Sequence, residues 1–204
     1  MTDYYLLNVS SLPDPAEDDT ALDGIPLWRC KKILKYIRCC DRRLSLGAWR
    51  LMEKALEQHG FSADRVITGK NGKPECAGIY FNLSHSDEMV LCVVSDRPVG
   101  CDIEKITAAP MEIVEHFFSH KERAYISASN SVTESNQHFF KLWTIKESYM
   151  KMTGEGMSLS PIRIEVDPED NSIRRDGVLV SCRLSVSVFD GYAIAVCTGR
   201  GGNL

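Results

Sequence analysis

Three apolar segments that follow one another almost without interruption constrain the fold of this chain more than any other feature. Residues 78–83, 89–95 and 98–103 have the composition of strands, and the tight turn SDRP at 95–98 joins the last two. The sequence therefore predicts three consecutive strands in the middle of the chain.

The order of expected elements is similar in the two halves of the chain, although no repeat is visible at the level of residues. Strands are predicted at 4–9, 78–83, 89–95, 98–103, 162–167, 178–188 and 192–198, and a turn at 68–74. Helices are predicted at 27–38, 41–59, 110–118, from 119 onward and at 137–152, with a loop at 130–136. We therefore predict an α+β fold of two similar lobes (a pseudo-dimer), residues 1–105 and 106–204, each with a small antiparallel sheet and helices. An active site would lie at the lobe junction, because pockets favour such interfaces.

Two acidic side chains occupy alternate positions of one predicted strand, VGCDIEK at 99–105. Side chains two residues apart on a strand point to the same face, so Asp102 and Glu104 should lie side by side. Like charges this close repel each other unless a cation lies between them. A hard divalent cation such as Mg²⁺ takes oxygen ligands of this kind. A pair of solvated carboxylates on an edge strand is the alternative.

A second charged pair, Glu147 and Lys151, lies on the predicted helix 137–152. Phe140 and Trp143 fall on the same side as this pair, so the helix carries apolar side chains on two sides. Such a helix is expected between layers, which would bring the pair partly buried to the lobe junction. There Glu147 would add a third carboxylate to a cation site, and Lys151 a positive charge for a phosphate. An exposed i,i+4 ion pair is the alternative.

Composition argues against several classes of protein. The chain of 204 residues is 44% apolar and 25% charged, which is typical of a soluble globular protein. No apolar run approaches the roughly 20 residues that span a bilayer, and the acidic N-terminus does not resemble a signal peptide. Eight scattered cysteines without C-x-x-C indicate reduced thiols and a cytoplasmic protein. The net charge of −4 disfavours general nucleic-acid binding.

One segment departs from this acidic balance. Residues 29–43 contain seven basic side chains and a single acid, Asp41. If the first helix ran on, its basic residues would form a stripe of Lys31, Lys35, Arg38 and Arg42. A dedicated anionic partner and a solvated helix face are equally compatible with this pattern.

Both charged constellations match one known signature. VGCDIEK at 99–105, followed about forty residues later by WTIKESYMK at 143–151, resembles the motif of the Sfp-like (surfactin synthetase-activating) 4′-phosphopantetheinyl transferases. Three further blocks resemble that family in the same order: DRRLSLG at 41–47, GKP at 72–74 and FNLSHS at 81–86. Together the blocks cover residues 29 to about 160. Cys101 departs from the family's usual Ile or Val.

The resemblance implies an enzyme that transfers 4′-phosphopantetheine from coenzyme A to a serine hydroxyl of an apo acyl or peptidyl carrier protein, releasing 3′,5′-ADP. It implies Mg²⁺ held by Asp102, Glu104 and Glu147, with Glu147 accepting the serine proton directly or through a water and Lys151 balancing phosphate charge. Lys146 would contact a phosphate or support the residues that do, and a surface position is the alternative. The 3′-phosphate and adenine of coenzyme A would be held by Lys31, Arg43, Lys73, Ser84 and His85, with the contribution of Trp28 or Arg29 open. We expect a monomer that binds neither nucleic acid nor membrane.

Three other functions are compatible with parts of this pattern. A Mg²⁺-dependent phosphodiesterase would use the same carboxylates, but it leaves the GKP and SHS blocks unexplained. A non-catalytic carrier-protein binder would not need the intact set of Asp102, Glu104, Glu147 and Lys151. A structural metal protein is disfavoured by the cysteine spacing.

Overall fold

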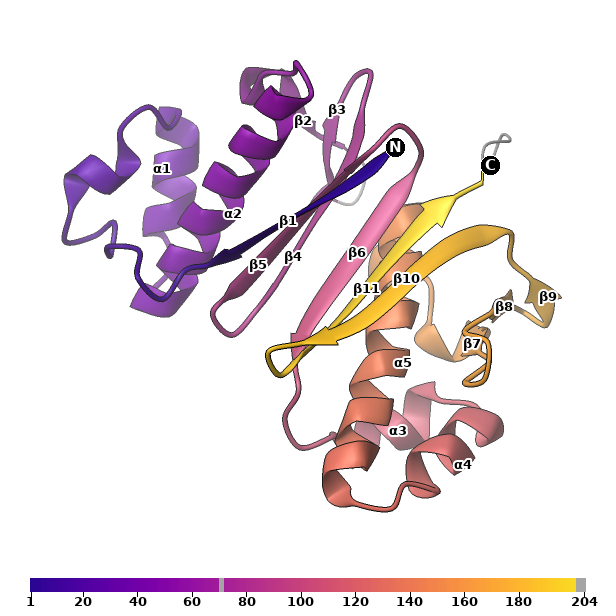
Figure 1. The fold of residues 1–204 in the computed structure, drawn as a ribbon. Helices are drawn as coiled ribbons and strands as arrows, with labels where there is room; N and C mark the ends of the chain where they lie inside the picture. The colour runs from indigo at the N-terminus through magenta and orange to yellow at the C-terminus, as the bar shows by residue number, and fades with distance from the viewer. Residues whose placement is uncertain (70–71, 201–204) are drawn as a thin grey trace.

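The computed structural model of this chain describes residues 1–69 and 72–200, with the elements arranged as in Figure 1. The strands are β1 (Thr2–Asn8), β2 (Val66–Thr68), β3 (Pro74–Cys76), β4 (Tyr80–Ser86), β5 (Met89–Ser95), β6 (Val99–Lys105), β7 (Ile164–Val166), β8 (Ile173–Arg175), β9 (Val178–Leu179), β10 (Cys182–Phe189) and β11 (Tyr192–Gly199). The α-helices are α1 (Leu27–Leu34), α2 (Cys39–Gln58), α3 (Met111–Phe117), α4 (His120–Ser127) and α5 (Val132–Thr153). The mixed α+β fold with small antiparallel sheets is confirmed.

The first half of the chain forms an antiparallel sheet in the order β1-β5-β4, with α2 packed on one of its faces. Alternation along β5 directs Val90, Cys92 and Val94 into the core beneath α2. α2 is helical because its apolar residues recur at helical spacing over more than three turns, from Leu44 to Leu56. This sheet therefore supports β4, an edge strand that borders the pocket described below.

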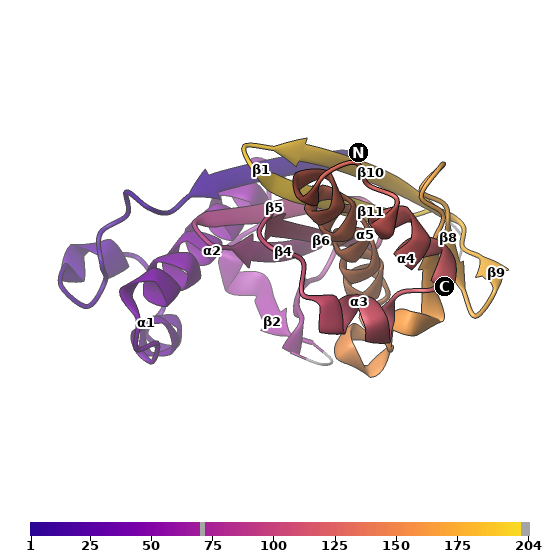
Figure 2. The same ribbon diagram turned by 90° about the horizontal axis from the view of Figure 1, so that it is seen from below.

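The second half forms another antiparallel sheet in the order β10-β11-β6, covered by α5. Ala193, Ala195 and Cys197 of β11 pack against the apolar side of α5. In the register of this sheet, Ala195 lies opposite Asp102 of β6. Figure 2 shows α2 and α5 below the strands of both sheets. Small side chains on β11 thus leave room for the helix to lie close to β6.

Side chains rather than backbone hydrogen bonds join the two sheets. β4 and β6 are the neighbouring edges, and the β4 side chains of Asn82, Ser84 and Ser86 point at the amides of β6. The amide of Cys101 donates to Asn82 Oδ1 at 2.9 Å, that of Ile103 to Ser84 Oγ at 3.3 Å, and that of Lys105 to Ser86 Oγ at 3.1 Å. On the opposite face, apolar residues of β5, β6 and β11 form a shared core. The strand that carries the block FNLSHS therefore joins the two sheets through its side chains, and we call this contact between β4 and β6 the seam.

Several elements differ from the expectations. β6 was expected to end the first lobe, but it pairs with β11 and belongs by hydrogen bonding to the second sheet. The division into two similar lobes at residue 105 stays a prediction. The expected loop at 130–136 is wrong, because α5 already begins at Val132, where the Ser131 side chain accepts from the amide of Glu134 and caps the helix. The capping box of Ser119 and Glu122 is confirmed. The expected turn at 68–74 lies partly outside the described residues.

The basic helix is also shorter than expected, because α1 ends at Leu34 rather than at Arg38. Arg38 instead begins α2 and forms an ion pair with Asp41 at 3.0 Å. Arg42 pairs with Asp14 and donates to the carbonyl oxygens of Tyr36 and Ile37. The four-residue basic stripe therefore does not exist, because two of its members hold the α1–α2 connection.

The eight cysteine thiols are free in this structure. Among the described residues, no helix combines the length and apolar character that crossing a membrane requires.

Candidate active site

A pocket of about 340 Å³ opens between β4, β6 and α5. Its lining residues come from the three sequence blocks that carry the signature: Leu83, Ser84, His85, Asp102, Glu104, Trp143, Glu147 and Lys151. All four charged residues of the two sequence constellations therefore lie together. Ser84 and His85, predicted as cofactor contacts, line the same pocket.

A glycine allows the helix and the strand to approach this closely. A Cβ atom at Gly100 of β6 would overlap the carbonyl oxygen of Ser148 and the amide nitrogen of Met152 on α5, and would lie 2.8 Å from the carbonyl carbon of Lys151. Only a residue without a side chain fits against a helix backbone at this distance. The Gly of VGCDIEK thus sets the distance between Asp102 on the strand and Lys151 on the helix.

Asp102 is the most buried of the acidic groups, with 2% of its surface exposed. Its Oδ1 accepts from Lys151 Nζ at 2.6 Å and from Ser84 Oγ at 2.8 Å, whereas Oδ2 is buried without a hydrogen-bond partner. Burial raises the pKa of this carboxyl above its ordinary value and outweighs the opposing effect of Lys151 and Ser84. Burial lowers the pKa of Lys151. The negative charge of Asp102, together with other contributions, outweighs burial and raises this pKa above its ordinary value. Lys151 is therefore a cation in this site.

The other two carboxylates face the same space. Glu104 Oε2 accepts from Ser86 Oγ at 2.7 Å, which orients the side chain along the seam. Burial, followed by the negative charge of Asp102, raises the pKa of both Glu104 and Glu147. The charged forms of all three carboxyl groups are disfavoured, so a cation that stabilises these charges would bind favourably in this region.

The chemistry of the three carboxylates suits a hard divalent cation, but their side chains are not spaced to bind one in this structure. Within residues 1–69 and 72–200, no three His, Cys, Asp or Glu side chains are arranged to hold a metal ion. The ammonium group of Lys151 instead occupies the space beside Asp102. The unpartnered, buried Oδ2 of Asp102 is the observation that favours a cation, because a hard cation binds such an oxygen.

The predicted contacts to coenzyme A divide into two groups. Ser84 and His85 lie in the pocket, and burial followed by the charge of Lys151 lowers the pKa of His85. Lys31, Arg43 and Lys73 do not line it. Lys31 is exposed on α1, and Arg43 is partly buried on α2, where its Nε has no hydrogen-bond partner.

Two basic residues have contacts that the sequence did not reveal. Lys73 Nζ donates to the carbonyl oxygen of Lys151 at 2.8 Å, so it ties the loop before β3 to the end of α5. Arg29 donates to the carbonyl oxygen of Ser45 at 2.6 Å and to its hydroxyl at 3.0 Å. Both cations therefore hold backbone segments together in this structure.

Lys146 has a different role from the expected phosphate contact. Its side chain is fully buried, and its Nζ donates to Glu122 Oε2 at 2.9 Å and to the carbonyl oxygens of Phe117, Pro161 and Ile164. Such a cation cannot reach the pocket. Removing one partner of a fully buried pair leaves an uncompensated charge, so this pair fixes α5 against α4 and β7.

Sequence reasoning missed the seam residues Asn82 and Ser86 and the packing role of Gly100. The sequence does contain a signal for the seam residues, because Asn82, Ser84 and Ser86 occupy alternate positions of a strand and must share a face. The helix contact of Gly100 had no local signal, since it depends on a segment about fifty residues away.

Comparison with known proteins agrees with this geometry. The sequence model of the 4′-phosphopantetheinyl transferase superfamily matches residues 98–197, which include β6 and α5. The 4′-phosphopantetheinyl transferase gsp of Aneurinibacillus migulanus is 34% identical over 177 residues, covering 81% of this chain and 72% of that protein. A 4′-phosphopantetheinyl transferase of Bacillus subtilis is 31% identical over 194 residues, covering 90% and 86%.

Among solved structures, the holo-[acyl-carrier-protein] synthase of Thermotoga maritima covers 50% of this chain and 64% of its own, with 19% identity and a TM-score of 0.39. A likeness of this size supports no conclusion about the site. The sequence matches define the class: this is an enzyme of the phosphopantetheine-transferring type. The chain belongs to the 4′-phosphopantetheinyl transferase superfamily.

Proposed function

We propose that this enzyme transfers the 4′-phosphopantetheine group of coenzyme A to a serine hydroxyl of an acyl or peptidyl carrier protein, releasing 3′,5′-ADP. One observation carries the proposal: Asp102, Glu104, Glu147 and Lys151 line a single pocket, on the strand and the helix that bear the family's two motifs. All of these residues come from one chain, which supports activity as a monomer.

The residues of this pocket suit phosphoryl transfer, which depends on positioning and on the neutralisation of charge. Asp102, Glu104 and Glu147 would hold Mg²⁺, which when bound supplies positive charge to the pyrophosphate of coenzyme A. Glu147 accepts the proton of the carrier serine, because it is the carboxylate that makes no hydrogen bond to β4. Lys151 neutralises the departing phosphate. Ser84 orients Asp102 through the bond to Oδ1.

The direct test is to incubate the protein with coenzyme A, Mg²⁺ and an apo-carrier protein and then to weigh the carrier by mass spectrometry. The expected result is the gain of one phosphopantetheine per carrier, abolished by EDTA. Cleavage of coenzyme A without a change in carrier mass would identify a phosphodiesterase. A stable complex with an unmodified carrier would identify a non-catalytic binder.

The 3′-phosphate of coenzyme A is expected to be recognised by Arg43 and His85. Arg43→Ala and His85→Ala should each weaken coenzyme A about 10-fold or more, because each removes a contact to a charged group. The same substitutions should barely affect dephospho-coenzyme A, which lacks this phosphate. Isothermal titration with both ligands measures the difference.

Lys73→Met serves as the comparison for this prediction. The ammonium group of Lys73 holds the end of α5. We therefore expect its removal to weaken the binding of coenzyme A and of dephospho-coenzyme A equally. A selective loss of coenzyme A in Lys73→Met, without one in Arg43→Ala or His85→Ala, would contradict this assignment of the phosphate contacts.

Docking of the carrier is expected on α1 and the connection that follows it. Leu34 at the end of α1 and Tyr36 and Ile37 in the connection to α2 are exposed beside Lys32 and Lys35, in a protein whose net charge is −4. Carrier proteins of this type are generally acidic around their serine, so they match this local charge. Lys32→Glu with Lys35→Glu should raise KM for the carrier several-fold at low salt, because interface charges act on the rate of association. KM for coenzyme A should change little.

Salt and a second double variant control for this effect. The difference should shrink at physiological ionic strength, where charges are screened over about 8 Å. Lys54→Glu with Arg65→Glu makes the same change of charge on exposed residues elsewhere and should leave KM for the carrier unchanged. An equal effect of both double variants would show that overall charge, and not α1, governs docking.

A further inference from the structure

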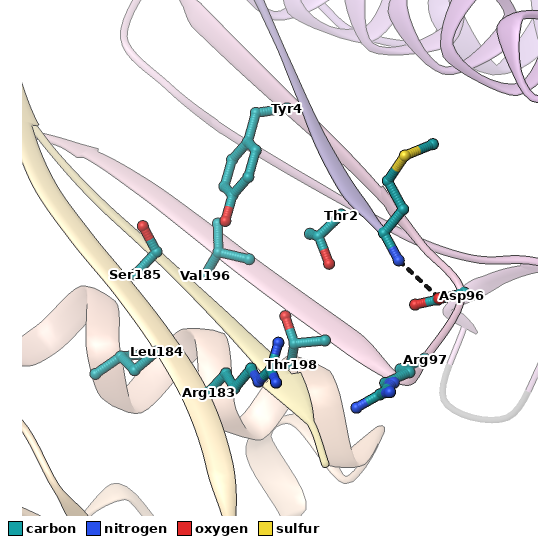
Figure 3. A pocket seen from close by; sticks show the side chains of 10 residues that line it. Thr2, Tyr4, Asp96, Arg97, Arg183, Leu184, Ser185, Val196 and Thr198 are labelled. Carbon is teal, nitrogen blue, oxygen red and sulfur yellow. Dashed lines mark hydrogen bonds and ion pairs between the residues drawn. The ribbon is translucent and has the colours of Figure 1, made fainter. Parts of the chain in front are cut away.

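We propose that this chain carries a second binding site, which takes the phosphate group of a small phosphorylated molecule, in a pocket between β1 and β10. The pocket has a volume of about 300 Å³ and is formed by β1, β10, β11 and the turn between β5 and β6 (Figure 3). This volume lies at the lower end of the range for small-molecule sites. The candidate active site uses none of its residues.

The sheet of β6 and β11 separates this pocket from the carboxylates. Val196 and Thr198 of β11, which line the pocket, lie opposite Cys101 and Val99 in the register. Asp102 occupies the alternate position on β6, so its side chain points to the other face, toward α5. A ligand bound here would therefore be distinct from coenzyme A bound beside Asp102.

Two guanidinium groups give the pocket its charge. Arg97 lies in the β5–β6 turn and Arg183 on β10, and no hydrogen bond or salt bridge engages either guanidinium group within the described part of the chain. Asp96 is the one acid among the residues that line the pocket, and its carboxylate accepts a hydrogen bond from the amino group of Met1 at 2.6 Å. Two unpaired arginines in one concavity of an acidic protein favour a doubly charged anion, and arginine matches the geometry of phosphate oxygens.

Hydroxyl groups add further hydrogen-bond donors to the pocket. Thr198 as a residue is 9% exposed, but its hydroxyl oxygen is accessible from the pocket and has no hydrogen-bond partner among the residues that the structure describes. Figure 3 shows the hydroxyl groups of Thr2, Tyr4 and Thr198 around one space, with Arg183 beside Thr198. The accessible hydroxyl of Thr198 can donate a hydrogen bond to a phosphate oxygen, which would add a third donor to the two arginines.

The arrangement favours a phosphate ester over a simple carboxylate. Donors approach from separate elements, namely Arg97 from the turn, Arg183 from β10 and Thr198 from β11, which suits a tetrahedral group with several acceptor oxygens. The ring of Tyr4 and the side chain of Val196 form an apolar wall beside them. The ligand is therefore a small phosphomonoester with an apolar or aromatic part.

Titration of the ¹⁵N-labelled protein with inorganic phosphate and with phenyl phosphate tests this site by NMR. The amides of Arg97, Arg183 and Thr198 should shift and saturate, and phenyl phosphate should bind more tightly than phosphate. Arg97→Gln and Arg183→Gln should each weaken this binding about 10-fold or more, because each removes a charge-assisted contact. Thr198→Val, which keeps the shape and removes the hydroxyl, should weaken it several-fold.

Arg174→Gln is the matched control, because it removes the same charge from an exposed residue of β8 outside the pocket. It should leave the titration unchanged. Shifts that do not saturate, or that respond to Arg174→Gln as much as to Arg183→Gln, would overturn the proposal. Acetate binding as tightly as phosphate would overturn the assignment to phosphate. Shifts confined to the amides around His85 would show that phosphate binds at the candidate active site alone.

Discussion

Asp102→Asn should lower the rate of phosphopantetheine transfer about 10²–10³-fold while the protein stays folded. The substitution keeps Oδ1 as an acceptor for Lys151 and Ser84 and removes the negative charge that would bind a cation. A loss of this size is typical when one preorganised electrostatic group is removed from an active site. Turnover of an apo-carrier at saturating coenzyme A, measured across a range of Mg²⁺ concentrations, gives both the rate and the requirement for metal.

Stability should not follow activity in this variant. Because burial raises the pKa of Asp102, this carboxyl costs stability in the metal-free protein, and the cost develops as the pH rises above the ordinary pKa of an aspartate. Loss of the charge therefore relieves one cost while it leaves Lys151 without its counterion, and the melting temperature should change little. Asp176→Asn, the same chemical change at an exposed ion pair, should leave turnover intact. A large fall in melting temperature for Asp102→Asn would instead indicate a structural role.

Gly100→Ala should destabilise the protein by about 3 kcal/mol, because the added methyl group overlaps backbone atoms of α5 on Ser148 and Met152. Backbone atoms cannot rotate away, so α5 must move from β6. Glu147 and Lys151 flank the contact and would move with the helix. A displacement of about 1 Å in an active site can cost 10²-fold in rate. Urea unfolding and the carrier assay measure the two effects.

Gly199→Ala is the control for this prediction. Gly199 also lies on a strand of the second sheet, but a Cβ atom there would meet its nearest neighbours at an ordinary 3.7 Å. It should therefore cost little stability and no activity. If Gly100→Ala unfolded at the same urea concentration as the unsubstituted protein, the close approach of α5 to β6 would not be a determinant of the site.

The sequence predicted features that depend on neighbouring residues. Alternation along residues 99–105 indicated that Asp102 and Glu104 share a face, and helical spacing placed Glu147 and Lys151 on one side of α5. The capping box at Ser119 followed from four consecutive residues. Where local signals compete, prediction was weaker: the polar residues before 137 indicated a loop, but Ser131 and Glu134 supply the cap and the first turn of a helix.

The charged residues of the first half show how local patterns can mislead about roles. The basic segment 29–43 predicted one helical stripe, and the structure uses Arg38 and Arg42 to pair with Asp41 and Asp14 instead. Lys146 likewise stands within a motif beside Glu147, yet it does not line the pocket and is buried with Glu122. Charge in a sequence does not reveal its partner, because the partner is brought close only by packing.

The sequence by itself thus determined the longer strands and helices, the family and the residues that carry its motifs, because periodicity and motif spacing are properties of short stretches of chain. Only the tertiary structure decided that β6 joins the second sheet, that the side chains of β4 form the seam to it, and that α5 lies against Gly100. These contacts join β4, β6 and α5, which are separate in sequence. The distance between Asp102 and Lys151 follows from them, because it is set by the packing of a helix on a strand and not by either segment alone.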